Sequence, residues 1–104
     1  MLKARVEILQ EMVNQDPSST FARYGLAQEY VNSGRLEEAV AEFVRLIEVN
    51  PDYTAAYFHG GRTLEKLGRA EEAREIYRRG LEACARVGDA HALSEMQAAR
   101  DQLG

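Results

Sequence analysis

The fold is decided by two consecutive stretches of the chain, residues 17–50 (PSSTFARYGLAQEYVNSGRLEEAVAEFVRLIEVN) and residues 51–84 (PDYTAAYFHGGRTLEKLGRAEEAREIYRRGLEAC). When the two stretches are aligned from their first residues, they share ten identical pairs, among them Pro17/Pro51 and Gly34/Gly68. Average composition would give roughly two identical pairs. The chain therefore contains a duplicated unit, and everything else in the sequence is interpreted outward from it.

Each copy predicts a helix, a tight turn and a second helix. Apolar residues recur at helical spacing in both halves, and no period-two alternation of β-branched residues persists. Gly34 and Gly68 divide the copies, because a helix that ends in a left-handed residue favours one without a Cβ atom. Pro51 prevents the next helix from starting earlier. These signals predict an all-α fold.

The period and residue types resemble the tetratricopeptide repeat, whose pattern is W-x₂-L-G-x₂-Y, then A-x₃-F, then P. Five residues of the first copy fall in the places of the pattern: Leu26, Tyr30, Ala39, Phe43 and Pro51. Ala27 is a small residue in the glycine place, whereas Arg23 departs from the tryptophan. In the second copy Gly61 and Ala73 match, Tyr57, Leu64 and Tyr77 are similar, and Gly60 and Ala85 depart.

The resemblance covers residues 20–87 and implies an α–α superhelix of helical hairpins, with about five to six helices. The small residues Ala27, Gly61, Ala39 and Ala73 would let helix backbones approach closely. Phe43 and Tyr77 would then wedge between their own helix pair and the next. Adjacent glycines at Gly60 and Gly61 are unfavourable in a helix, so a neighbour is expected to pack closely against them.

The flanks are predicted to close the array at both ends, because repeat arrays need atypical end units. The whole chain, 1–104, is taken as a single domain with an N-terminal half-repeat helix at 2–14, repeats at 20–53 and 54–87, and a capping helix at 89–103. The N-terminal helix would bury an apolar stripe consisting of Leu2, Val6, Leu9 and Val13 with Ile8 and Met12. The capping helix would bury Leu93, Met96 and Leu103. Between them, residues 70–87 should form the longest helix, with i,i+4 pairs Glu75/Arg79 and Glu82/Arg86.

Composition excludes several classes of protein. The 104 residues carry 17 Asp and Glu against 13 Lys and Arg, a net charge of -4, which gives no electrostatic reason to bind nucleic acid or anionic lipid. The four arginines Arg74, Arg78, Arg79 and Arg86 alternate with glutamates and predict a solvated, ion-paired face. One cysteine excludes an intrachain disulfide and favours a reducing compartment. Without a signal peptide or a membrane-spanning run, we expect a cytoplasmic protein.

Candidate catalytic groups are few. The two histidines, His59 and His91, lie in no known catalytic motif, so no active site, metal site or cofactor is predicted. His59 is expected either in a groove or facing water, His91 at the surface, and Cys84 as a small buried group. The remote alternative is an enzyme that uses His59 with Arg62 and Glu65.

The candidate binding residues form a row on the first helix of each copy, on the face away from its partner helix. They are Phe21, Tyr24, Gln28 and Asn32 in the first copy, and Phe58, Arg62 and Lys66, with His59, in the second. By the resemblance this row lines a concave groove that binds a peptide or a helix of another protein. Tyr24 and Phe58 would be apolar anchors, or would fill space between helices. They also stand where a carboxylate-clamping lysine or its equivalent would be, which disfavours a clamp for a peptide terminus.

The leading hypothesis is therefore a non-catalytic interaction module that binds another protein in this groove. The alternative is a homodimer that associates through exposed terminal helices. That alternative rests on the apolar content of Leu2, Leu9, Leu93, Met96 and Leu103.

Overall fold

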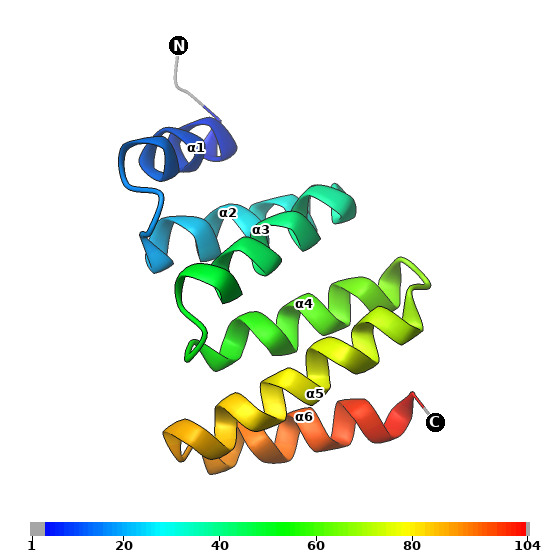
Figure 1. Ribbon diagram of the computed structural model, residues 1–104. Helices are drawn as coiled ribbons and strands as arrows, with labels where there is room; N and C mark the ends of the chain where they lie inside the picture. The colour runs from blue at the N-terminus through cyan, green and yellow to red at the C-terminus, as the bar shows by residue number, and fades with distance from the viewer. Residues whose placement is uncertain (1–3, 104) are drawn as a thin grey trace.

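The computed structural model describes residues 4–103, which form six helices and no strand. The helices are α1 (Arg5–Gln15), α2 (Thr20–Asn32), α3 (Leu36–Val49), α4 (Thr54–Lys66), α5 (Ala70–Val87) and α6 (Ala90–Gln102) (Figure 1). The predicted all-α fold is confirmed. As predicted, α5 is the longest of them at 18 residues, because Ala85 stands where the repeat would otherwise place a helix-ending proline.

The two repeats turn in the same way. Gly34 and Gly68 have φ angles of +76° and +75°, in the left-handed region where a Cβ atom is unfavourable. The N–H groups that follow them donate backward across the helix end, Arg35 to the Tyr30 carbonyl at 2.8 Å and Arg69 to the Leu64 carbonyl at 2.9 Å. The same turn geometry therefore joins the two helices of each hairpin, α2 to α3 and α4 to α5.

The hairpins stack into an elongated array of 47 × 28 × 19 Å. Each helix packs against the next along the chain, and α4 also contacts α6 (Figure 1). In this order α1 takes the place of the second helix of an unfinished hairpin, and α6 the place of the first. The helices α2, α4 and α6 are equivalent to one another, which places the candidate site on them.

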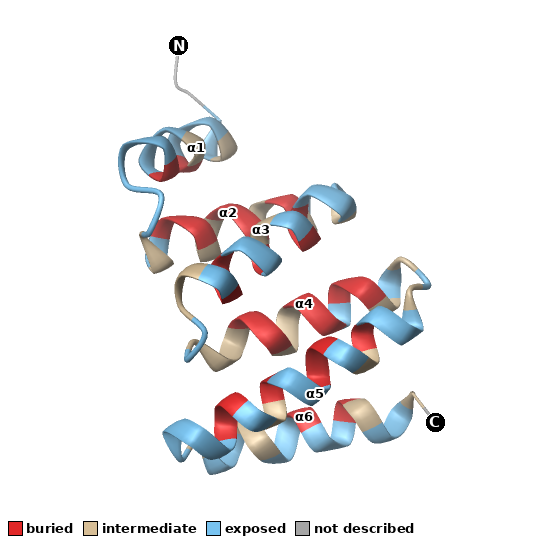
Figure 2. Cartoon of the chain, in the orientation of Figure 1, coloured by how far each residue is buried: buried red, intermediate tan, exposed pale blue. Residues whose placement is uncertain are grey.

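The small residues lie where the helices come closest, as the sequence predicts. Ala27, Ala39 and Ala73 have no exposed surface. The Tyr77 ring lies directly against the backbone of Gly61, and a Cβ atom placed on Gly60 would stand 3.3 Å from the Cβ atom of Phe43. The adjacent glycines are thus explained by aromatic side chains that need their space, and the buried faces of the helices meet in one core (Figure 2).

The first helix corrects part of the sequence analysis. It begins at Arg5, with Ala4 as its N-cap, and ends at Gln15; the predicted start at residue 2 lies outside the described part of the chain. Leu9 and Val13 are buried, but Ile8 and Met12 are 45% and 36% exposed. The prediction that Ile8 and Met12 join the buried stripe is wrong because α1 has a helix on only one of its sides.

The apolar residues that suggested self-association are mostly not available. Leu9 is 6% exposed and Met96 is fully buried against Gly80, while Leu93 and Leu103 are half-buried. Leu2 lies outside the described residues. Leu9 and Met96 therefore cover the core and offer no exposed apolar face, while self-association itself stays a prediction.

The surface of α5 pairs its charges differently from the prediction. Arg78 lies between Glu75 and Glu82 and pairs with both, while Arg86 reaches Asp52 at 2.7 Å. Arg79 still lowers the pKa of the Glu75 carboxyl, by less than Arg78 does, so this predicted pair interacts. The predicted pair Glu82/Arg86 is wrong, because Glu82 pairs with Arg78 and Arg86 with Asp52. Arg78 is three residues after one glutamate and four before the other, so one guanidinium can bridge both.

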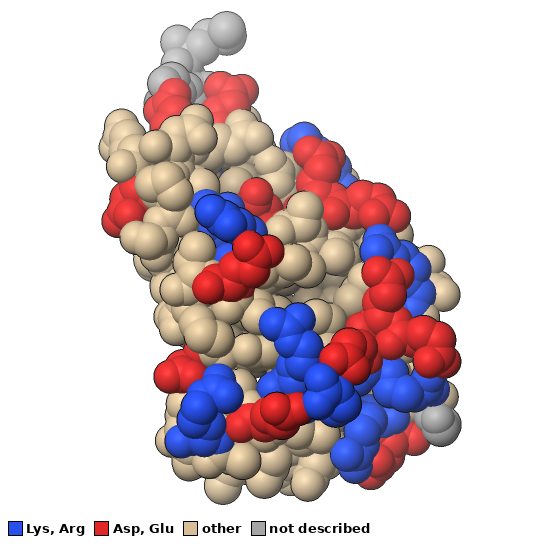
Figure 3. Space-filling model, viewed as in Figure 1, with Lys and Arg blue, Asp and Glu red and all other residues tan. Residues whose placement is uncertain are grey.

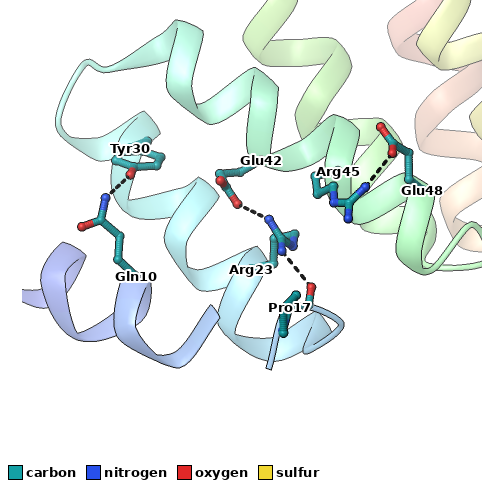
Figure 4. A network of polar contacts seen from close by, with 7 residues as sticks. All are labelled: Gln10, Pro17, Arg23, Tyr30, Glu42, Arg45 and Glu48. Carbon is teal, nitrogen blue, oxygen red and sulfur yellow. Dashed lines mark hydrogen bonds and ion pairs between the residues drawn. The ribbon is translucent and has the colours of Figure 1, made fainter. Parts of the chain in front are cut away.

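Arg23, which stands in the tryptophan place of the family pattern, is buried. Its guanidinium donates to the Glu42 carboxylate at 2.9 Å and to the Pro17 carbonyl at 2.7 Å (Figure 4). Its side chain is 7% exposed. At the equivalent position of the second repeat, Tyr57 donates its hydroxyl to the Pro51 carbonyl at 2.6 Å. These hydrogen bonds hold the loops that precede α2 and α4 against those helices.

Candidate functional site

The candidate site begins with an aromatic cluster on the side of α2 and α4. The Tyr24 ring packs edge-on against Phe43, Tyr53 and His59, with ring centroids 6.3, 5.5 and 5.8 Å apart. Such edge contacts between rings are favourable beyond the area they bury. Tyr24 is therefore partly a packing residue, in line with the second of the two alternatives weighed for it, and it fixes the position of His59.

His59 is half-buried in the same cluster. Its imidazole stacks on Phe43 at 6.3 Å and meets the edge of Phe58 at 5.3 Å. Burial lowers the pKa of His59; the Glu95 carboxylate raises it and the Arg62 guanidinium lowers it, both by less than burial does. The imidazole is thus neutral at physiological pH, and its role in the cluster is that of a flat, polar ring.

A pocket of about 240 Å³ opens beside this cluster, between α4 and α6. Its lining combines apolar side chains with polar ones, two of them carboxylates: Thr54, Ala55, Phe58, His59, Asp89, Ala92 and Glu95. The pocket lies on the face of α4 that the sequence predicts for binding, because Phe58 and His59 line it. It is shared between the second repeat and α6, so the last helix forms part of the candidate site as well as covering the core.

Asp89 is held in place at the mouth of this pocket. One carboxylate oxygen accepts the Ala92 N–H at 3.0 Å as the N-cap of α6, and the other accepts the Thr54 hydroxyl at 3.1 Å. The backbone hydrogen bond from Ala92, followed by that from Thr54, lowers the pKa of Asp89. The carboxyl group therefore stays ionised, and it joins the starts of α4 and α6.

The eight residues predicted for the groove lie in different surroundings. Phe58 and His59 line the pocket, and Tyr24 contacts His59. The Arg62 guanidinium lies over the Phe58 ring at 5.8 Å, and Gln28 donates to the Tyr24 hydroxyl at 3.0 Å. The remaining three are exposed and outside the pocket lining: Phe21, Asn32 and Lys66.

The sequence analysis missed Tyr53 and the α6 side of the pocket. Tyr53 immediately precedes α4 and packs on Tyr24. Asp89, Ala92 and Glu95 are missed because the sequence identifies α6 only as a cap. Four further residues at the end of α5 move α6 out of the repeat register, so a comparison at the period of the repeat does not align it with α4. An Asp-capped helix after the last repeat was the available signal.

The three residues of the remote catalytic alternative lie on different sides of α4. Glu65 accepts a hydrogen bond from the Tyr77 hydroxyl, toward α5, whereas His59 contacts rings on the other side of α4. His59, Arg62 and Glu65 therefore do not form the catalytic group considered as a remote alternative. Among residues 4–103, no cluster of three or more His, Cys, Asp or Glu side chains is placed to bind a metal ion.

Cys84 and His91 take the surroundings that the sequence predicts. Cys84 is 1% exposed, and burial raises the pKa of its thiol, so the thiolate needed for reactivity is disfavoured. The side chain of His91 is 88% exposed and pairs with Glu95 one turn further along α6.

The arginines of α5 form a mixed-charge surface, not a basic patch. Figure 3 shows Lys and Arg interleaved with Asp and Glu over this face. Arg74 pairs with Glu71 and Arg78 with Glu75, as expected of a solvated, ion-paired face. In the part of the chain that the structure describes, no helix combines the length and the apolar character needed to cross a membrane.

Similarity to known proteins agrees with this architecture. The family model described as "Tetratricopeptide repeat" matches residues 24–87, more than half of the chain. The chain belongs to the tetratricopeptide repeat family. Proteins of this family are in general interaction modules without chemistry of their own. The resemblance stated from Leu26, Tyr30 and Ala39 is thereby confirmed.

Individual relatives agree with the family assignment. A TPR repeat-containing protein of Pseudomonas aeruginosa is 30% identical over 91 residues, which is 88% of this chain and 87% of that protein. The solution structure of a tetratricopeptide repeat domain protein from Salinibacter ruber is 38% identical, with a TM-score of 0.79, and covers 85% of this chain and 89% of that one. The TPR2B domain of yeast Sti1, in a structure that contains pHsp70, has a TM-score of 0.86 over 94% of this chain and 78% of that one at 18% identity, which shows a shared fold alone.

Proposed function

We propose that the face formed by α2, α4 and α6 binds a segment of another protein, and that the chain has no catalytic role. The single observation that carries the proposal is the pocket of about 240 Å³ between α4 and α6, with Phe58 on its wall. A pocket that joins apolar side chains to a few polar groups suits one anchoring side chain of a partner. The Sti1 domain, which is similar in fold and is complexed with pHsp70, supports a protein-binding role in general terms.

Phe21 extends this surface. Its side chain is 76% exposed, the most exposed of the large apolar side chains in the described part of the chain, and it lies one helical turn before Tyr24 on α2. Aromatic and arginine side chains dominate the binding energy of protein interfaces. We therefore assign contact roles to Phe21, Phe58 and Arg62, and a supporting role to Tyr24, whose ring is already packed.

Selection of binding peptides from a random displayed library, followed by affinity measurements on variants, tests the proposal. Phe58→Ala and Phe21→Ala should each weaken the selected peptides by about thirtyfold or more, the range of interface hot spots. Val44→Ala is the matched control, because Val44 is a 39% exposed apolar side chain on α3, outside the pocket. Equal affinities for all variants and the parent would contradict the proposal.

A second proposal, self-association, has one specific observation in its favour. Met12 is the counterpart of Leu46 in the repeat register, yet Leu46 is fully buried and Met12 is 36% exposed beside Ile8. A second copy that covered α1 would bury both side chains. Sedimentation should then show a dimer that Ile8→Glu dissociates; a monomer over a wide concentration range would rule this proposal out.

A further inference from the structure

We infer that the pocket between α4 and α6 receives a partner segment in which an apolar side chain stands next to a lysine or an arginine. The inference rests on the proposed function and adds the chemistry of the partner to it. It follows from how the apolar surface and the charges are distributed around this one pocket.

The floor of the pocket selects the apolar side chain. Phe58 presents a half-buried ring, and Ala55 and Ala92 face the same space from α4 and α6. These two alanines leave the room that larger side chains would fill. A volume of about 240 Å³ accommodates a leucine-sized or phenylalanine-sized side chain with part of its backbone.

The rim supplies negative charge on the α6 side. Asp89 accepts hydrogen bonds from the Ala92 N–H and the Thr54 hydroxyl, which lower the pKa of its carboxyl and keep it ionised. Both of its oxygens are therefore already engaged. Glu95 is the more available group, since its side chain is 44% exposed. Its only described ion pair is with His91, and a pair as exposed as this one contributes little. A cation brought by a partner can therefore compete for Glu95.

Among the described residues, no cation lines the same pocket. Arg62 is directed over the Phe58 ring, and Lys66 lies one turn further along α4; neither belongs to the lining. His59, the remaining basic side chain at the wall, is kept neutral by burial beside the Tyr24 ring. At His59 the effect of the Glu95 carboxylate also exceeds that of Arg62. The lining thus joins the apolar Ala55, Phe58 and Ala92 to the two carboxylates Asp89 and Glu95, which complements an apolar side chain flanked by a basic one.

The test uses a random displayed library of linear peptides selected on the intact protein. Selection is run at low salt, about 0.05 M, where exposed charges are least screened. Peptides are retained only if Phe58→Ala abolishes their binding. Among them, we expect an apolar residue adjacent to Lys or Arg, with a preference that fades between about 0.05 M and about 0.5 M salt.

Charge variants then assign the preference to the pocket. Glu95→Gln should weaken the best peptide by about two- to fivefold, the range of an exposed ion pair, and Glu95→Lys should shift selection toward Asp and Glu. Asp101→Asn makes the same loss of charge on α6 outside the pocket and should change nothing.

The outcomes separate this inference from the proposed function. Peptides that depend on Phe58 but carry no basic residue, or that carry acidic ones, would overturn the inference and leave the proposed function standing. Failure to select any peptide that depends on Phe58 would overturn the proposed function and the inference with it.

Discussion

Arg23 in the first repeat and Tyr57 in the second occupy the same position of the repeat, and both donate to the carbonyl of the proline that begins their unit. The residue of the second helix at the position of Glu42 differs between the repeats, in accordance with the charge of the donor. Arg23 has the Glu42 carboxylate as a partner, whereas the counterpart of Glu42 is Ile76, which is 8% exposed. A charged donor comes with a charged acceptor, and a neutral donor with an apolar residue.

A second pair of positions varies in the same coordinated manner. Tyr77 donates to Glu65 in the second repeat, while in the first repeat Phe43 has no hydroxyl and Val31 stands in place of Glu65. In both comparisons the repeats share the backbone shape, and the buried side chains differ between polar and apolar only where both members of the pair differ. Buried polar groups allow no other arrangement.

The largest expected effect comes from breaking one of these matches. Glu42→Ile would leave the guanidinium of Arg23, whose side chain is 7% exposed, without its charged partner. Loss of one member of a buried ion pair costs about 3 kcal/mol or more. The free energy of unfolding, measured by urea titration, should fall by this amount.

The double variant Arg23→Tyr/Glu42→Ile gives the first repeat the chemistry of the second. It should restore most of the stability, to within about 1 kcal/mol of the parent, because a neutral hydroxyl can still reach the Pro17 carbonyl. Additive losses in the double variant would show that the two repeats do not share this packing solution.

The next effect concerns the small residue on the first helix of each repeat. The first repeat has Ala27 at this position and Phe43 where the second has Tyr77, but a Cβ atom on Gly61 would overlap the Tyr77 ring. Gly61→Ala should cost about 2 kcal/mol from overpacking, measured by thermal or urea unfolding. Gly25→Ala is the control, because there the new Cβ atom would meet only the flexible end of Leu9, at 3.2 Å, and the loss should be much smaller.

A smaller effect is expected from the hydroxyl of Tyr77. Tyr77→Phe removes the hydrogen bond to Glu65 and should cost about 1.5 kcal/mol, with part of it recovered in Tyr77→Phe/Glu65→Val, the pairing of the first repeat. Burial, and then the hydrogen bond to Glu65, raises the pKa of Tyr77. The folded state therefore favours the protonated phenol, and this stability is present below pH about 10 and is lost as the pH rises further. Unfolding measured between neutral and alkaline pH should show a weaker alkaline loss in Tyr77→Phe than in the parent.

The smallest expected effect is an equal loss at the two turn glycines. Gly34 and Gly68 have the same left-handed φ and no atom within 4 Å of an added Cβ atom. Gly34→Ala and Gly68→Ala should each cost about 1 kcal/mol, from backbone strain alone. Unequal losses in parallel unfolding experiments would show that the two turns are not equivalent.

The sequence predicts the hairpins well because their determinants are local and repeated. Glycine turns, small residues and helical spacing can all be identified without knowledge of tertiary contacts, as Gly34 and Ala39 illustrate. Exposure at the ends is different, because it depends on which neighbours are present. The pattern predicts both Ile8 and Met96 inside, yet Ile8 is exposed while Met96 is buried.

The candidate site was only half predictable for the same reason. Phe58 and His59 lie on a repeated helix face that spacing identifies, whereas Glu95 lies on α6, outside the repeat register. The direction of individual side chains also needs coordinates. Spacing places Tyr24 and Arg62 in one row, but only ring contacts show that Tyr24 is packed and that Arg62 lies over Phe58.

The most direct measurement of the central claim is a chemical-shift map of the ¹⁵N-labelled protein with a selected peptide. The account predicts that the largest amide shifts fall on α4 and α6 around Ala55, Phe58 and Ala92, with smaller shifts along α2 near Phe21. Shifts confined to the opposite hollow between α3 and α5, around Val44 and Ile76, would contradict it.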